Sequence, residues 1–136
     1  MTSGLSGPAF DICLLEGQVE EHAVAHILCK ATFEVKNDKR ARETGNVFVE
    51  FRQGSTIKGE GRPSGICITE AAWYVFKVQD DALIFIETER LKQICREQLG
   101  KRDSVMGGDF NKFEGVLVPL TALIAAPTKE PLQIAA

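Results

Sequence analysis

Hydrophobic and polar positions alternate most clearly in the middle of the chain, and this alternation predicts strands. Residues 46–52 place two valines and a phenylalanine on one face and mostly polar residues on the other, which is the period of two expected of a half-buried strand. Residues 82–86 and 113–118 are apolar runs bounded by polar or turn-forming residues. We therefore expect a strand in each of these three segments.

The N-terminal part of the chain predicts a hairpin. Residues 10–15 form a short apolar run, and residues 24–35 are rich in β-branched and aromatic side chains. Gly17 and the polar residues after it begin a turn between the two runs. We expect two paired strands here, and a further short strand over residues 64–68.

The pattern changes to the period of a helix toward the C-terminal end. Residues 88–99 carry apolar side chains on one face, with Thr88 as a possible cap and Gly100 after the last turn. Residues 70–76 follow Thr69 and begin with an acidic residue, which also predicts a capped helix. A short helix is expected over residues 119–126, where a proline occupies the first turn.

These elements together predict an α/β fold with a central mixed β-sheet flanked by helices. Strands that pair as hairpins come first, and strands that alternate with helices follow. The length of 136 residues suits one domain over residues 10–126. Residues 1–9 form a small, polar lead-in, and residues 127–136 form a tail.

Composition favours a globular protein of a reducing compartment. Apolar residues make up 44% of the chain and charged residues 26%. The four cysteines form no CxxC pair, so we expect reduced, buried thiols rather than a zinc site. No signal peptide is visible, and no apolar run reaches the ~20 residues that span a bilayer. We expect a cytoplasmic protein with no membrane partner.

The charge is distributed unevenly, although the net charge is only −3. Residues 36–62 contain seven basic and four acidic residues, so this segment is cationic within an acidic chain. A cationic segment of this kind is typical of a phosphate-binding surface, and also of an ordinary solvated loop.

The candidate chemistry lies at the end of the second expected strand. Side chains alternate along a strand, so Glu34 and Lys36 share one face, while Phe33 and Val35 are expected to point into the core. The hairpin expected upstream would bring Asp11 beside Glu34. Two carboxylates and a main-chain carbonyl are hard oxygen ligands that suit Mg²⁺.

Such a site supports phosphodiester chemistry. The metal ion polarises a phosphate and lowers the pKa of a bound water, and Lys36 would orient that water or neutralise developing charge. A plain salt bridge at the end of a sheet is the alternative explanation for the same residues, and the pattern alone leaves both open.

A family resemblance strengthens the first explanation. Asp11 and Phe33-Glu34-Val35-Lys36 resemble the Asp–(Asp/Glu)-x-Lys signature of the restriction-endonuclease-like nuclease superfamily, PD-(D/E)XK. A longer pattern across residues 10–125 is similar to small nuclease-like proteins of bacteriophages. Its motifs include Thr44-Gly45-Asn46-Val47-Phe48-Val49-Glu50, Arg62-Pro63-Ser64-Gly65-Ile66, Ala72-Trp73-Tyr74 and Leu117-Val118-Pro119-Leu120.

The resemblance implies a restriction-endonuclease-like fold and Mg²⁺-dependent hydrolysis of DNA, with Mn²⁺ able to substitute. Asp11, Glu34 and the Val35 carbonyl would bind the metal, and Lys36 would assist the attacking water. Many members carry another glutamate on a helix before the first strand. Here that ligand is absent or is replaced by Glu16, Glu21 or Glu50.

Partners follow from the same resemblance. A chain this small would cut both strands as a homodimer, and a resolvase of branched DNA such as a Holliday junction is one version of this function. If the protein is encoded by a phage, its compartment is the host cytoplasm. The alternative is that the chain is a catalytically inactive protein with the nuclease fold, which binds nucleic acid or a host protein. Residues expected to contact DNA are Lys39, Arg40, Arg42, Arg62 and Ser64.

Overall fold

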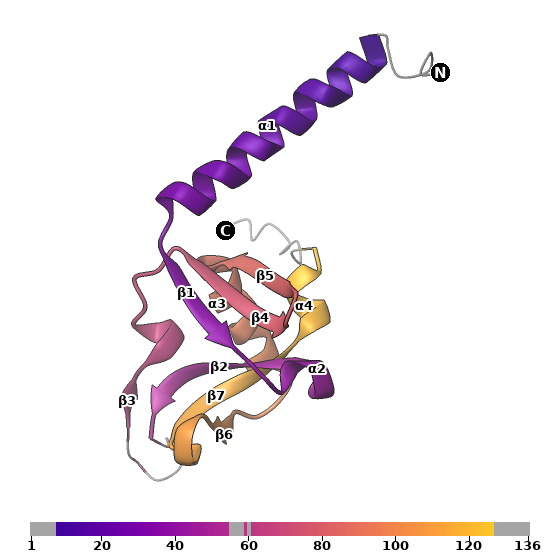
Figure 1. Ribbon diagram of the computed structural model, residues 1–136. Helices are drawn as coiled ribbons and strands as arrows, with labels where there is room; N and C mark the ends of the chain where they lie inside the picture. The colour runs from indigo at the N-terminus through magenta and orange to yellow at the C-terminus, as the bar shows by residue number, and fades with distance from the viewer. Residues whose placement is uncertain (1–7, 55–58, 60, 127–136) are drawn as a thin grey trace, which may run out of the picture. The chain divides into compact units, whose positions relative to one another are not determined.

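The computed structural model describes residues 8–54, 59 and 61–126, with the side chains of residues 8–14 left aside. The chain divides into two compact units, Met1–Thr32 and Phe33–Ala136 (Figure 1). The domain expected over residues 10–126 therefore spans both units, and the part that contains the sheets begins at Phe33.

The described part of the first unit is one helix, α1 (Pro8–Lys30), so the hairpin expected from the sequence is wrong. Proline suits the first turn of a helix, because its missing N–H has no intrahelical partner there. Lys30 lies in the last turn, where a cation interacts favourably with the helix dipole. Alanine, leucine and glutamate between these ends favour the helix over the strand that the valines suggest.

The second unit contains a three-stranded mixed sheet in the order β1-β4-β5. Strand β1 (Phe33–Asn37) runs parallel to β4 (Trp73–Gln79), and β4 pairs antiparallel with β5 (Ala82–Glu87). The helix expected over residues 70–76 is thus wrong, since most of this segment forms the central strand. An apolar run of this kind suits a central strand, whose side chains are mostly buried by its neighbours.

A second sheet of four strands lies beside the first, in the order β3-β2-β7-β6 (Figure 1). Its long strands, β2 (Asn46–Gln53) and β7 (Phe113–Pro119), are antiparallel, as are the short strands β3 (Arg62–Pro63) and β6 (Val105–Gly107) at its edges. The strands expected over residues 46–52, 82–86 and 113–118 are confirmed.

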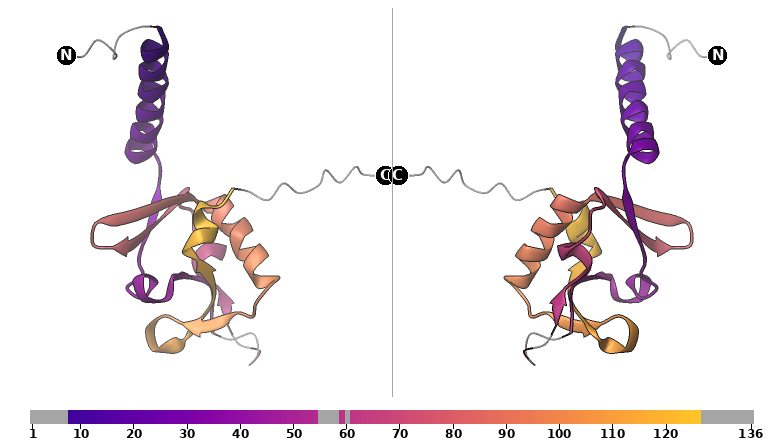
Figure 2. Two further views of the ribbon diagram at one scale, coloured as in Figure 1. Left: turned by 90° about the vertical axis from the view of Figure 1, so that its right-hand side faces the viewer. Right: turned by 90° about the vertical axis from the view of Figure 1, so that its left-hand side faces the viewer.

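Among the described residues of the second unit, one longer helix and four short helical elements accompany the strands. The helix expected over residues 88–99 is confirmed as α3 (Thr88–Leu99), which packs against β4, β5 and β7 (Figure 2). The strand expected over residues 64–68 is instead a 3-10 helix. The short elements are α2 (Ala41–Thr44), η1 (Gly65–Cys67), η2 (Asp109–Asn111) and α4 (Leu120–Ile124).

One hydrophobic core holds both sheets and α3 together. Tyr74 and Phe76 enter it from β4, and valines of β2 and β7 enter it from the second sheet. Leu91 and Ile94 of α3 complete it and are almost completely buried. The unit is therefore a mixed α/β fold with helices packed on its sheets, as the sequence predicts.

The cysteines agree only in part with the expected burial. Cys95 is buried in the core, and burial raises the pKa of its thiol to about 12. Cys29 and Cys67 are exposed, and the side chain of Cys13 lies outside the described residues. Among the helices that the structure describes, none is both long enough and apolar enough to cross a membrane.

Glycines on β6 and β7 leave room for the ring of Phe48 on β2. A β-carbon on Gly115 would lie 2.5 Å from two ring atoms of Phe48 and 2.6 Å from the Val49 carbonyl oxygen. A β-carbon on Gly107 would lie 3.0 Å from the same ring. The position of the Phe48 ring therefore depends on the absence of side chains at both positions.

Replacing Gly115 with alanine should consequently destabilise the protein. We expect the free energy of unfolding in urea to fall by about 1–3 kcal/mol, because the added methyl overlaps backbone as well as the ring. Gly17→Ala is the matched control, since nothing lies within 4 Å of a β-carbon there and Gly17 is helical. Equal stability of Gly115→Ala and the parent chain would contradict the packing described.

Candidate functional site

Glu34 and Lys36 lie together on β1, as the alternation along the strand predicts. The Lys36 ammonium lies 2.7 Å from a Glu34 carboxylate oxygen, and both side chains are partly exposed, at 41% and 38%. An ion pair this exposed contributes at most about 1 kcal/mol to stability. The pair therefore keeps charge accessible at the end of the sheet and adds little to the stability of the fold.

The face of β1 on which this pair lies differs from the expected one. Glu34 is in register with Tyr74 and Lys36 with Phe76, both of which point into the core from β4. Val35 points the other way, and its side chain is 65% exposed. The prediction that Val35 enters the core is wrong, because β1 is an edge strand and its polar side chains lie at the rim of the buried face.

The phenol of Tyr74 is influenced by carboxylates of both sheets. Burial raises the pKa of Tyr74 far above its ordinary value, the negative charge of Glu34 raises it further, and Glu50 of β2 adds a smaller contribution. A hydrogen bond from Thr69 opposes these effects. The negative charges of Glu34, on β1, and of Glu50, on β2, therefore both raise the pKa of the buried Tyr74 phenol.

Asp11 does not reach this cluster by the route that the sequence suggests. Asp11 lies within the helix α1, in the first unit. The strand that pairs with β1 is β4, and the segment around Asp11 forms no strand. The side chain of Asp11 is outside the described residues. The hairpin that would bring Asp11 beside Glu34 is not formed, so the strand pairing on which this prediction depends is wrong.

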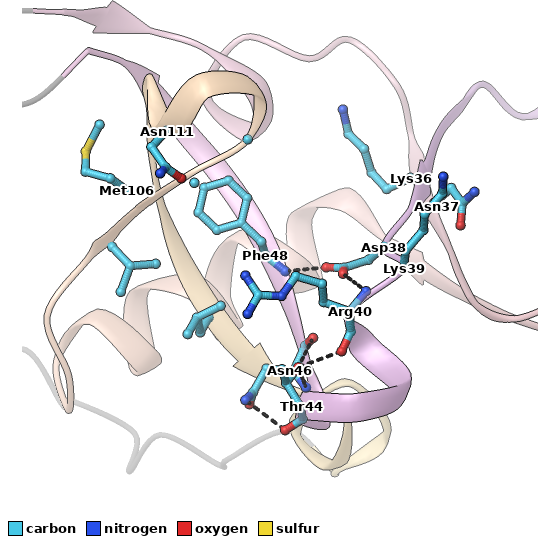
Figure 3. Close-up of a pocket in the computed structure, with 14 residues that line it drawn as sticks. Lys36, Asn37, Asp38, Lys39, Arg40, Thr44, Asn46, Phe48, Met106 and Asn111 are labelled. Atoms are coloured by element: carbon cyan, nitrogen blue, oxygen red, sulfur yellow. Dashed lines mark hydrogen bonds between the residues drawn. The ribbon is translucent and has the colours of Figure 1, made fainter.

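A cavity of about 650 Å³ opens beside the end of β1 (Figure 3). Its cationic lining consists of Lys36, Lys39 and Arg40, and Lys39 and Arg40 form no ion pair within the described part of the chain. The opposite lining comes from β2, β6, β7 and the segment between β6 and β7. These residues are Asn46, Phe48, Val105, Met106, Gly107, Gly108, Asn111 and Leu117.

Asp38 fixes the shape of this cavity, although it was not singled out from the sequence. One carboxylate oxygen accepts the backbone N–H of Arg40 at 3.1 Å, and the other accepts that of Phe48 at 2.8 Å. Figure 3 shows Asp38 between these two residues, with the Arg40 side chain extending beside the Phe48 ring. An aspartate two residues before the N–H that it binds is a local turn signal visible in the sequence, whereas the bond to Phe48 is not.

The remaining residues expected to bind DNA do not line the cavity. Arg42 pairs with Asp80 at 3.4 Å, and the Arg62 guanidinium donates to the Gln53 side chain at 3.0 and 3.2 Å. Ser64 is buried, and its hydroxyl has no hydrogen-bond partner in the structure. Of the five predicted DNA contacts, the structure thus places only Lys39 and Arg40 at one site with Lys36.

The described residues contain no group of three or more histidine, cysteine, aspartate or glutamate side chains arranged to hold a metal ion. The Glu34 carboxylate, beside the Lys36 ammonium, is a hard oxygen ligand of the kind that Mg²⁺ prefers. No protein-family model matches the chain, and searches among curated proteins and solved structures found no significant match.

The electrostatic coupling between Glu34 and Tyr74 is directly measurable, because Tyr74 is the single tyrosine of the chain. We expect Glu34→Gln to lower the pKa of Tyr74, since the phenolate no longer faces that carboxylate. Absorbance of the phenolate during an alkaline titration measures this shift. Glu89→Gln on α3 is the control and should leave the titration unchanged.

The same shift fixes the sign of the pH dependence of stability. A raised pKa in the folded state means that the contribution of Tyr74 is complete below the ordinary tyrosine pKa of about 10 and is lost as the pH rises above it. Identical titrations of Glu34→Gln and the parent chain would show that the two groups are not coupled.

Proposed function

We propose that the chain is a metal-dependent endonuclease that hydrolyses phosphodiester bonds of DNA. The observation that carries the proposal is the position of Lys36. Its ammonium contacts the Glu34 carboxylate, and its side chain also lines the cavity that contains Lys39 and Arg40. A group of cations next to a carboxylate suits phosphate binding, and it suits hydrolysis when the carboxylate also binds a metal ion.

The basic residues of the cavity would bind the DNA backbone. Lys39 and Arg40 follow β1 directly and are exposed, so a phosphate can reach both without displacing a buried group. Arginine binds two phosphate oxygens at once, and a lysine adds a point charge. Lys36 would then neutralise charge that develops on the phosphate, because it is the cation nearest to Glu34.

The carboxylates that fit a metal-dependent reaction are Glu34 and Glu50, with the main-chain carbonyl of Val35 as a further oxygen. In this proposal Glu50 takes the role that the sequence assigned to Asp11. Bound Mg²⁺ or Mn²⁺ supplies Lewis-acid activation of the phosphate and of a water molecule. Glu34 also holds the Lys36 ammonium at 2.7 Å, so removing either charge leaves the other without its partner.

A second function is favoured by two other observations. The hairpin that would add Asp11 to the site is absent, and the described residues gather no three-ligand metal group. Both suit a protein that has the cationic cavity but no catalysis. That protein would bind nucleic acid, or a host protein, without cutting it.

A homodimer remains the simplest way for a chain of this size to cut both strands of DNA. The outer face of the β1-β4-β5 sheet offers an apolar surface for a second copy, because Val35, Leu83 and Phe85 are 65%, 55% and 41% exposed there. Branched DNA, including a Holliday junction, is the substrate class that such a pair of sites would suit.

Cleavage of supercoiled plasmid and branched DNA tests the proposal. We expect nicking with Mg²⁺ or Mn²⁺ and none with EDTA. Glu34→Gln, Glu50→Gln and Lys36→Met should each lower the rate by about 100-fold or more, because each removes a charge from the reacting phosphate or its metal. The change is measured from the initial rate of nicking at saturating metal.

The matched controls are Glu89→Gln and Lys92→Met, which break a similar ion pair of 3.1 Å on α3. Their rates should equal that of the parent chain. Metal-dependent nicking that survives all three substitutions at the site would contradict the assignment of these residues. DNA binding without cleavage by the parent chain would support the inactive binding protein instead.

A further inference from the structure

The cavity beside β1 has two chemically different halves. Lys36, Lys39 and Arg40 form one half, and the Phe48 ring with Val105, Met106 and Leu117 lies in the other. Two amide side chains, Asn46 and Asn111, also line it. The volume of about 650 Å³ lies in the range of small-molecule sites, which is more than a phosphate alone requires.

Phe48 is held by a hydrogen bond of its backbone and by close packing of its ring. Its backbone N–H donates to Asp38 at 2.8 Å, which fixes β2 against the turn after β1. Gly107 and Gly115 leave the space that the ring occupies, since a β-carbon at either position would lie 3.0 Å or less from it. A rigid aromatic ring costs little conformational entropy when a flat ligand stacks on it.

A second aromatic residue, Phe110, lies in η2, next in sequence to a residue that lines the cavity. Phe110 is 89% exposed and has φ of 60°, in the left-handed region that a bulky residue rarely adopts. Gly108 and Asn111 on either side of it both line the cavity. The Lys112 ammonium lies 5.6 Å from the centre of the Phe110 ring. An exposed aromatic in a strained backbone conformation indicates a ligand contact more than a packing role.

We propose that this cavity binds one unpaired nucleotide of a DNA strand. Its base would lie against Phe48 and the apolar half. The polar edge of the base would meet Asn111 and the side-chain oxygen of Asn46, whose amide nitrogen donates to the Thr44 carbonyl at 3.2 Å. Its phosphate would lie on Arg40 and Lys39, and Phe110 would stack on the neighbouring base. The inference rests on the proposed function and narrows its substrate to DNA with an unpaired segment, such as a branch point or a single-stranded end.

The chemistry of the lining supports a base as well as a phosphate. Stacking on aromatic rings accepts any base, because every base has a π-face, so no sequence preference is required. The amide groups can both donate and accept hydrogen bonds, which suits the mixed edge of a base. A bare phosphate or a sugar phosphate has no apolar surface that could pack against Phe48, Met106 and Leu117.

Binding of three labelled oligonucleotides to the full chain tests the inference, measured by fluorescence anisotropy in EDTA. The first is a short single strand, the second is the same strand with one abasic position, and the third is the duplex. We expect the intact single strand to bind about tenfold tighter than the abasic strand, in line with the contribution of one stacked base. The duplex should bind more weakly than the single strand.

Substitutions separate the two halves of the cavity. Phe48→Leu retains the backbone N–H to Asp38 and should abolish the difference between the intact and abasic strands. The double substitution Lys39→Gln and Arg40→Gln should lower the affinity for the intact and the abasic oligonucleotide by the same factor. The difference between the two affinities should remain, because phosphate contacts are independent of the base.

Phe110→Asn provides a variant that does not threaten folding, since asparagine tolerates a positive φ. This substitution should lower the affinity for the single-stranded oligonucleotide severalfold and leave the affinity for deoxythymidine monophosphate unchanged. Equal loss of both ligands would contradict the stacking role of Phe110. Mononucleotide binding without a gain for the oligonucleotide would overturn the assignment to a DNA strand and indicate a free nucleotide as the ligand.

The outcome is separable from that of the cleavage assay. Equal affinity for intact and abasic strands would overturn the inference, even if the chain cuts plasmid DNA with Mg²⁺. A clear preference for the base in a chain that never cuts DNA would support the nucleotide site and contradict the endonuclease.

Discussion

The carboxylate of Asp38 joins the two sheets and determines where the site can form. It lies just after β1 and binds one backbone N–H of the following turn and one of β2, at 3.1 and 2.8 Å. Hydrogen bonds to a charged acceptor are stronger than neutral ones, and a partly buried N–H left without a partner would cost about 1–3 kcal/mol. Because of this link, the turn that carries Lys39 and Arg40 stays beside the strand that carries Phe48.

The charges of the site follow from the edge position of β1. A central strand would have to bury Glu34 and Lys36 with the core residues Tyr74 and Phe76, at a high cost of desolvation. At the edge, the two side chains share the inner face of the sheet and still reach water, at 38% and 41% exposure. Tyr74 is buried beside them, where the effective dielectric constant is lower than in water. The charges of Glu34 and Glu50 therefore act more strongly on the Tyr74 phenol.

Elements with a strong periodicity, or with an apolar run between clear turn signals, could be predicted from the sequence, and elements with conflicting signals could not. The helix Thr88–Leu99 and the strand Asn46–Gln53 have clear patterns, and both are found as expected. Thr69 and Glu70 resemble a helix cap and predict a helix over residues 70–76, whereas Trp73–Gln79 forms a central strand, which shows no alternation. In Pro8–Lys30, valines suggested strands where the surrounding alanine, leucine and glutamate form a helix.

The candidate site was predictable to the extent that it depends on local geometry. Alternation along a strand was enough to place Glu34 and Lys36 together. The contribution of Asp11 required a hairpin that does not form, and those of Asp38, Glu50 and Phe48 depend on contacts between separate strands. Such contacts are set by how the sheets pack, and no short motif in the chain reports them.

The central claim is that nucleic acid binds in the cavity at the end of β1, and an NMR titration tests it most directly. A single-stranded oligonucleotide is added to ¹⁵N-labelled protein in EDTA, and the shifts of the backbone amides are followed. The account predicts that the largest shifts occur in residues 36–40, 46–48 and 105–111, around the cavity lining. Large shifts near Arg62 and Gln53, with the amides of Arg40 and Phe48 unchanged, would contradict it.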